Sequence, residues 1–301
     1  MTQYALSFAT YATLADVRME LAVDDPSYTS DDPKALKALR DATARIDLEL
    51  PGKTFFPRVQ TRYFDSYAST EGLNLYLSEP LAELTALTNG DGSVLAGGEY
   101  TLLPKSGAPY HTVRLAANGA IAWLIAPDGD PVDAISVAGV WHSTRPYSGM
   151  WFNPGETITL ATTTTASFTP SDVDGVDAFR RTPRFSEGML LKATSSSTTE
   201  YLEITRIESG VVYVQRGARG TTAVAHTAAA LSVWQVEPVI AKACARLASY
   251  YYKRAGHFAS VTFNPNTGMA DRLPKDMPDD VVSVLEKFKG AASQPLRILD
   301  V

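Results

Sequence analysis

The sequence of 301 residues has very little cysteine, and Cys244 is its only one. A single cysteine excludes an intrachain disulfide and a zinc site built on several cysteines. Folding in a reducing compartment is the more typical setting for such a chain. Charged residues make up 20% and hydrophobic residues 45% of the sequence. A chain of this length and composition can bury a sizeable core without covalent links.

Long apolar runs and a basic amino-terminal region are also lacking. No run reaches about 18 residues, the length that a membrane-spanning helix needs, and the first basic residue is Arg18. We therefore expect neither a membrane protein nor a secretory signal peptide. The formal net charge of -6 argues against a protein that coats nucleic acid. Residues 239–301 nevertheless carry nine basic and six acidic residues. Such asymmetry is typical of steering or of head-to-tail self-association, and the alternative that stays open is an ordinary solvated surface.

Catalytic and metal-binding motifs are missing from the sequence. The histidines at 111, 142, 226 and 257 form no HxH or HExxH pattern. There is no G-x-S-x-G elbow, and residues 217–222 lack the lysine of a phosphate-binding loop. Cys244 lies on an apolar helical stripe, which is typical of a buried small side chain. We therefore expect no enzyme, cofactor or metal, although a weak loop cation site at Asp128, Asp130 and Asp133 stays open.

Two segments near the amino terminus have the apolar spacing of helices. The pair Thr13 and Asp16 is similar to a capping box, and apolar residues follow it at helical spacing. A second segment begins with Asp32 as the N-cap residue and Pro33 in the first turn, and it ends at Pro51–Gly52. Neither helix can bury its apolar face alone, so both require a partner helix.

The carboxyl-terminal part supplies this partner. A helical stripe is formed by Ile240, Cys244, Leu247 and Tyr251. Gly256 ends this helix, and a shorter one runs from Asp279 to Gly290. We expect the longer helix to dock against the two amino-terminal helices.

Between the two terminal helical regions, apolar residues recur at every second position. Short alternating segments, among them 74–77 and 84–87, and the turn sequence at 89–92 predict antiparallel strands joined by hairpins. A threonine- and serine-rich region follows and predicts a small all-β insertion domain. The predicted fold class is α+β, with amino- and carboxyl-terminal helices forming one small helical bundle that β structure interrupts. The expected parts are a helical core of 1–58 and 237–290, an antiparallel β region of 59–153, an insertion domain of 154–236 and an extended tail of 291–301.

Two groups of residues are candidates for contacts with other proteins. Tyr250, Tyr251 and Tyr252 are consecutive on the expected helix, so they point about 100° apart and cannot all face one core. With Lys253 and Arg254 they are candidates for a subunit interface. The second group lies in the tail and comprises Pro295, Leu296, Arg297, Ile298 and Leu299. An apolar segment of this kind can join a partner's sheet or groove, and the alternative is a frayed or folded-back end.

A set of segments along the chain carries a family resemblance: residues 11–17, 45–47, 55–58, 75–77, 84–87, 100–104 and 137–141, and the closing helix with Lys253 and Arg254. Together they resemble the head–tail connector, or adaptor, proteins of tailed bacteriophages. The insertion is similar to a β module of phage structural proteins, on the motifs at 188–191, 200–203, 212–217 and 220–226.

The resemblance implies a structural virion protein, made in the host cytoplasm and located at the head–tail interface. Such a protein joins the portal vertex to the tail as an oligomeric ring, commonly of twelve subunits. The tail candidates would bind the portal protein, and a stopper or tail-completion protein would bind the far side. DNA would pass through the lumen without sequence-specific binding, and no membrane is involved. Two alternatives stay open: a carbohydrate- or receptor-binding module, and another virion part such as a stopper or tail-completion protein.

Overall fold

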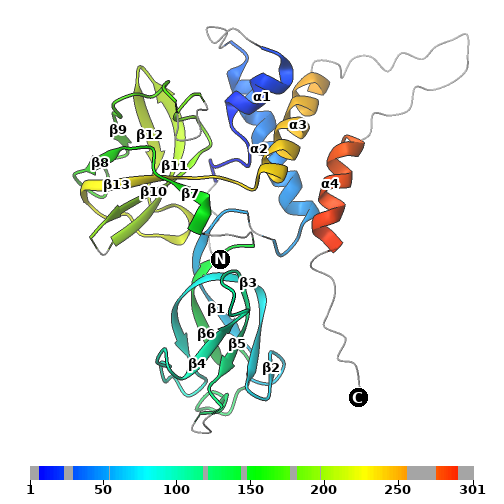
Figure 1. Ribbon diagram of the computed structural model, residues 1–301, viewed down its shortest axis with the longest axis vertical. Coiled ribbons are helices and arrows are strands. Elements are labelled where there is room, and N and C mark those ends of the chain that lie inside the picture. The colour runs from blue at the N-terminus through cyan, green and yellow to red at the C-terminus, as the bar shows by residue number, and fades with distance from the viewer. Residues whose placement is uncertain are drawn as a thin grey trace, which may run out of the picture.

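The computed structural model describes residues 7–23, 30–53, 55–117, 121–143, 148–176, 182–196, 198–255 and 276–290. This described part contains two antiparallel sheets, of six and seven strands, and four α-helices (Figure 1). The predicted fold class, a helical bundle interrupted by β structure, is therefore wrong, because the chain is mostly β. The helices occupy only the two ends of the chain, whereas each sheet encloses an apolar core of its own.

The four helices form one group beside the second sheet (Figure 1). They are α1 (Leu14–Leu21), α2 (Asp32–Glu49), α3 (Pro238–Ala255) and α4 (Asp279–Gly290). The capping box is confirmed, since Thr13 Oγ1 accepts from the Asp16 N–H and the Asp16 carboxylate accepts from the Thr13 N–H. The predicted N-cap of α2 is wrong by one residue. Asp31 is the N-cap and Asp32 already lies in the first turn, where the fixed φ of Pro33 is also accommodated.

The apolar stripe of α3 packs against α1 and α2. Val17, Leu39, Ile46, Ile240 and Leu247 are all fully buried and belong to one cluster. α4 completes this cluster through residues such as Val281 and Leu285. Because the cluster also includes residues of both sheets, it is the core that joins all parts of the molecule.

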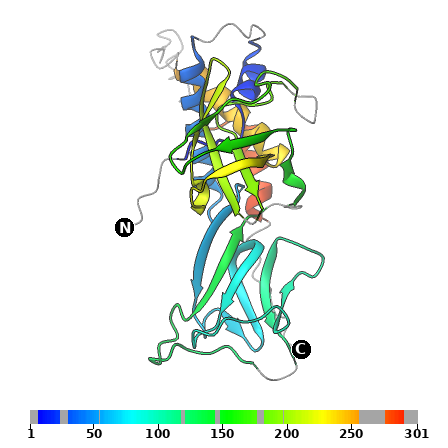
Figure 2. The same cartoon turned by 90° about the vertical axis from the view of Figure 1, so that its left-hand side faces the viewer.

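The first sheet lies at one end of the molecule (Figures 1 and 2). Its strands are β1 (Arg58–Phe64), β2 (Thr70–Glu71), β3 (Asn74–Thr88), β4 (Tyr100–Leu103), β5 (Tyr110–Leu115) and β6 (Ile135–Trp141). They follow the order β1-β6-β3-β5-β4, and β2 pairs with β3. The segments predicted as separate strands at 74–77 and 84–87 form a single strand, β3. Register shifts along β3 let its first half pair with β5 and its second half with β6.

The second sheet lies beside the helices. Its strands are β7 (Trp151–Phe152), β8 (Thr157–Leu160), β9 (Ser167–Phe168), β10 (Leu190–Ser195), β11 (Thr198–Glu208), β12 (Val211–Gln215) and β13 (His226–Trp234). Short 3-10 helices are η1 (Ser148–Met150) and η2 (Ala218–Gly220). The strand order is β7-β13-β10-β11-β12-β9, and β8 also pairs with β13. Since β7 pairs with β13, the second sheet begins slightly before the expected boundary at 154.

Candidate functional site

The helices and both sheets meet at the backbone carbonyl of Phe55, in the segment after α2. Trp234, at the end of β13, donates its indole Nε1–H to this oxygen across 3.0 Å. His142, directly after β6, places Nε2 at 3.2 Å from the same oxygen. Because a carbonyl oxygen only accepts, Nε2 of His142 carries a hydrogen. This junction fixes how the two sheets lie relative to the helices.

A second tie connects the η2 turn of the second sheet to the start of the described chain. The Glu203 carboxylate accepts from Arg219 Nε at 2.7 Å and from the backbone N–H groups of Phe8 and Ala9 at 2.5 and 3.2 Å. The Arg219 guanidinium also lies 4.4 Å from the centre of the Phe56 ring. The side chain of Glu203 is almost fully buried. The contact is therefore a desolvated, charge-assisted clamp between the second sheet and the helical part.

Glu200 forms a similar charge-assisted clamp inside the second sheet. Its carboxylate accepts from Arg216 Nε and Nη2, both at 2.7 Å, and from the backbone N–H groups of Gly217 and Val224. Burial favours the neutral acid, but these donors outweigh it and lower the pKa of Glu200 below its ordinary value. Glu200 is therefore an ionised structural partner that holds the loop between β12 and β13.

A serine and a histidine extend this network. Ser195 Oγ lies 2.9 Å from His226 Nδ1, and His226 Nε2 lies 3.2 Å from Glu200 Oε2. A Ser–His–Glu chain is the arrangement of a hydrolytic triad. Here, however, the carboxylate is already saturated by Arg216 and two backbone amides, and its acceptor sites hold the loop in place. The geometry supports a structural network more than proton transfer.

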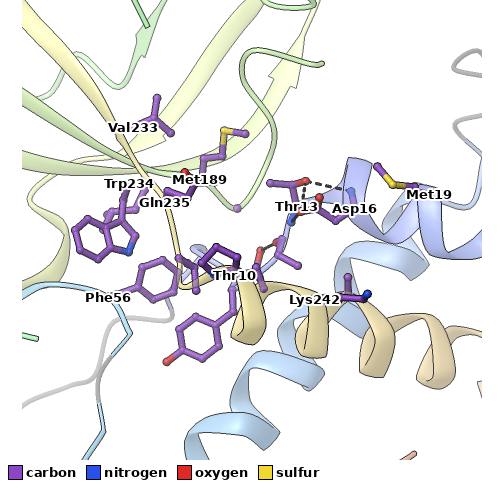
Figure 3. Close-up of a pocket in the computed structure, with 18 of the residues that line it drawn as sticks. Thr10, Thr13, Asp16, Met19, Phe56, Met189, Val233, Trp234, Gln235 and Lys242 are labelled. Atoms are coloured by element: carbon purple, nitrogen blue, oxygen red, sulfur yellow. Dashed lines mark hydrogen bonds between the residues drawn. The ribbon is translucent and has the colours of Figure 1, made fainter. Parts of the chain in front are cut away.

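A cleft of about 410 Å³ is lined by the region 10–20, the second sheet and α3 (Figure 3). Its walls come from the segment before α1, the loop before β10, the end of β13 and the first turns of α3. Trp234 and Phe56 lie toward one end of the cleft, and Met19 and Lys242 lie toward the other (Figure 3). The lining is apolar with scattered polar groups.

A wider groove of about 700 Å³ continues from this cleft along α3. We call it the α3 groove, and its lining residues are Glu20, Pro238, Val239, Lys242, Ala243, Arg246, Asp280, Val281 and Val284. The floor is apolar and the rim is charged. Arg246 pairs with Asp280 at 3.0 Å and with Glu20 at 3.4 Å. Within the described part of the chain, Lys242 has no ion pair.

The predicted subunit-interface residues lie on the last turns of α3. The three tyrosines are half-buried against the helical core, and Tyr252 donates its hydroxyl to Asp31 at 2.9 Å. Burial raises the pKa of Tyr251 above its ordinary value. Lys253 is exposed, and Arg254 Nη1 lies 3.6 Å from Asp276 Oδ1. The predicted portal-interface residues, Pro295 to Leu299, lie outside the described residues.

The sequence interpretation missed the α3 groove and the junction at Phe55. The groove had a local signal: Val239 and Val282 are apolar residues that lie outside the buried stripes of α3 and α4. The junction had none, because Trp234 and Phe55 are 179 positions apart.

Searches with the sequence found no matching family model and no matching curated protein. Across the described ranges, no three histidine, cysteine, aspartate or glutamate side chains are arranged to hold a metal ion. No helix in those ranges combines the length and apolarity that crossing a membrane requires.

Proposed function

We propose that the protein is a structural part of a tailed-bacteriophage virion, an adaptor that joins the portal vertex to the tail as an oligomeric ring. The observation that carries this proposal is that residues in the resemblance motifs hold the parts of the molecule together. Phe55 and Glu203 belong to those motifs, and each joins one part of the molecule to another. In a protein that acts through its shape, the characteristic residues are expected to fix the relative positions of its parts.

The arrangement of the parts agrees with this role. The first sheet extends from one end of the molecule and the second sheet lies beside the helices, so different surfaces face in different directions (Figures 1 and 2). A ring subunit needs such distinct surfaces, because it contacts two neighbouring copies and proteins above and below. In this proposal the partners are the portal protein, a stopper or tail-completion protein and other copies of the chain, and DNA passes through the lumen.

The proposal is tested by expressing the full chain together with the portal protein of the phage that encodes it. We expect a complex that survives size-exclusion chromatography and shows a ring below the portal in negative stain. In the phage itself, loss of the gene is expected to give filled heads without attached tails. Infectious particles that assemble normally without the protein would overturn the proposal.

Ligand binding by the first sheet is a second candidate, favoured by exposed tyrosines. Tyr63, Tyr67 and Tyr76 are 60%, 71% and 40% exposed. They lie at the same end of the sheet, since the Tyr76 N–H donates to Ser69 in the turn after β1. Exposed tyrosines are typical of binding surfaces. A glycan array with the full chain tests this candidate, and specific binding that Tyr67→Ala abolishes would favour it.

A further inference from the structure

We propose that the α3 groove receives the outer face of α2 from a second copy of this chain, so that copies associate head to tail. This inference rests on the proposed function, in which copies form a ring, and it names the two surfaces that meet. Both surfaces consist of described residues.

The first surface is the α3 groove. Val281 is buried at its base, while Val239 is 47% exposed beside it. Next to the groove, Met19 is 78% exposed and Val282 is 39% exposed. An exposed group of apolar side chains with a charged rim is typical of a protein–protein contact.

The second surface is the outer face of α2. It consists of Lys37, Asp41, Ala44 and Leu48, which follow one another at intervals of three or four residues and are all exposed. Such spacing places them on one stripe of the helix. Leu48 projects from this stripe with 71% of its surface exposed. Within the part of the chain that the structure describes, Lys37 Nζ and Asp41 Oδ2 form an ion pair only with each other, at 2.7 Å.

The two surfaces face in opposite directions across α3. Cys244 faces α2, since its Sγ lies 3.5 Å from Thr43 Oγ1. Lys242 and Arg246, which line the groove, are each two positions away from Cys244 along the helix. Two positions correspond to about 200° of rotation, so the groove lies on the side of α3 that faces away from α2. Contacts between two different, opposed surfaces generate a ring or a filament and not a closed symmetric pair.

The chemistry of the two surfaces is complementary. Among the described residues, Lys242 has no ion-pair partner, and the Asp41 carboxylate pairs only with the exposed Lys37. The apolar floor at Val239 and Val284 offers a place for Leu48. A helix stripe with a projecting leucine is the kind of occupant that apolar grooves between helices accept.

Cysteine crosslinking tests this contact directly. We expect a mixture of the Leu48→Cys and Val239→Cys proteins, treated at high concentration with a short bis-maleimide, to form a covalent dimer. A chain carrying both substitutions is expected to form a ladder of oligomers. The native Cys244 is fully buried and does not compete. A matched control replaces Leu48→Cys by Tyr67→Cys, because Tyr67 is equally exposed, at 71%, and lies in the turn between β1 and β2, away from the helices.

Charge reversal tests the pairing of Lys242 with Asp41. We expect Lys242→Glu or Asp41→Lys, each added to the chain that carries both cysteines, to reduce the crosslinked fraction about tenfold. Combining the two reversals is expected to restore it. Circular dichroism spectra like that of the parent protein show that the variants are folded.

The outcomes separate this inference from the proposed function. The inference is overturned if the crosslinking yield of Leu48→Cys with Val239→Cys is no higher than that of the Tyr67→Cys control. This holds even when the protein binds the portal. A strong crosslink in a protein that does not bind the portal supports the contact and counts against the adaptor role. If Val239→Cys instead links to Ile298→Cys, the occupant of the groove is the chain's own tail, and the inference is wrong.

Discussion

Trp234 and Phe55 are joined by a hydrogen bond of 3.0 Å between the indole Nε1–H and the backbone carbonyl. The same oxygen also contacts His142 Nε2 at 3.2 Å, so one acceptor serves a side chain from each sheet. The Trp234 and His142 rings pack edge to face with centroids 4.7 Å apart. This contact couples both sheets to the segment that follows α2, and its loss is expected to loosen the whole arrangement.

Trp234→Phe removes the indole donor and keeps an aromatic ring. We expect a loss of about 1 kcal/mol in the free energy of unfolding, measured in urea, because a buried hydrogen bond contributes about that much. Trp151→Phe is the matched control, since the Trp151 Nε1 is buried with no hydrogen-bond partner among the described residues and its ring also packs against Trp234. The control is expected to lose less stability. Equal losses in both variants would show that ring packing, and not the hydrogen bond to Phe55, stabilises the junction.

The contact between the η2 turn and β1 leaves no room for a side chain at Gly220. A Cβ built at Gly220, where φ is +84°, would lie 1.9 Å from the Val59 carbonyl oxygen. Gly220→Ala is therefore expected to cost more than the roughly 1 kcal/mol of left-handed strain alone. Gly210→Ala is the matched control, because φ there is +78° and an added Cβ would meet no atom of the described residues within 4 Å, apart from its chain neighbours. Thermal unfolding of the two variants checks this, and equal shifts in Tm would contradict the clash.

The sequence predicted the features that neighbouring residues determine. The capping box of Thr13 and Asp16 formed as expected. The turn at 89–92 is also present, since the Gly92 N–H donates to the Asn89 carbonyl. In both cases the residues that bond lie three positions apart, so the pattern itself contains the contact.

Features that depend on distant residues were not predictable in this way. The segments 74–77 and 84–87 were predicted as separate strands, yet β3 continues through Pro80, which lies between them and lacks an N–H. The register shift between Tyr76 and Leu81 brings the proline to a position where the ladder needs no donor. The prediction of the fold class was wrong for a related reason. Long helices give a strong local signal, whereas strands of two residues such as β7 and β9 exist only through their pairing.

The buried carboxylate of Glu200 makes stability depend on pH. Its pKa in the folded protein lies below the ordinary value, so its contribution is fully present above the pKa of the unfolded chain, about 4.3. The contribution is lost as the pH falls through the lower pKa of the folded state. Glu200→Gln leaves Arg216 buried without a charged partner and is expected to cost about 3–5 kcal/mol near neutral pH.

Urea unfolding between pH 7 and pH 3 measures this effect. The difference between the parent protein and Glu200→Gln is expected to stay constant down to about pH 4.3 and to shrink below it. Glu208→Gln is the control, since the pair of Glu208 with Arg206 is exposed on both sides and is expected to contribute less than about 1 kcal/mol. A difference that does not change with pH would show that Glu200 is not ionised in the folded state.

Cys244 is expected to report on unfolding of the helical core. Burial raises the pKa of its thiol to about 12, and the Thr43 hydroxyl only partly opposes this. Since the thiolate is the reactive form, alkylation by iodoacetamide at pH 8 is expected to be more than about a thousandfold slower in the folded protein than in urea. The exposed thiol of Val239→Cys, on the same helix, is expected to react rapidly under the same conditions. Rapid alkylation of Cys244 in the folded protein would mean that α3 separates readily from α2, and the rigid helical core inferred from the packing of Ile240 and Leu247 would be wrong.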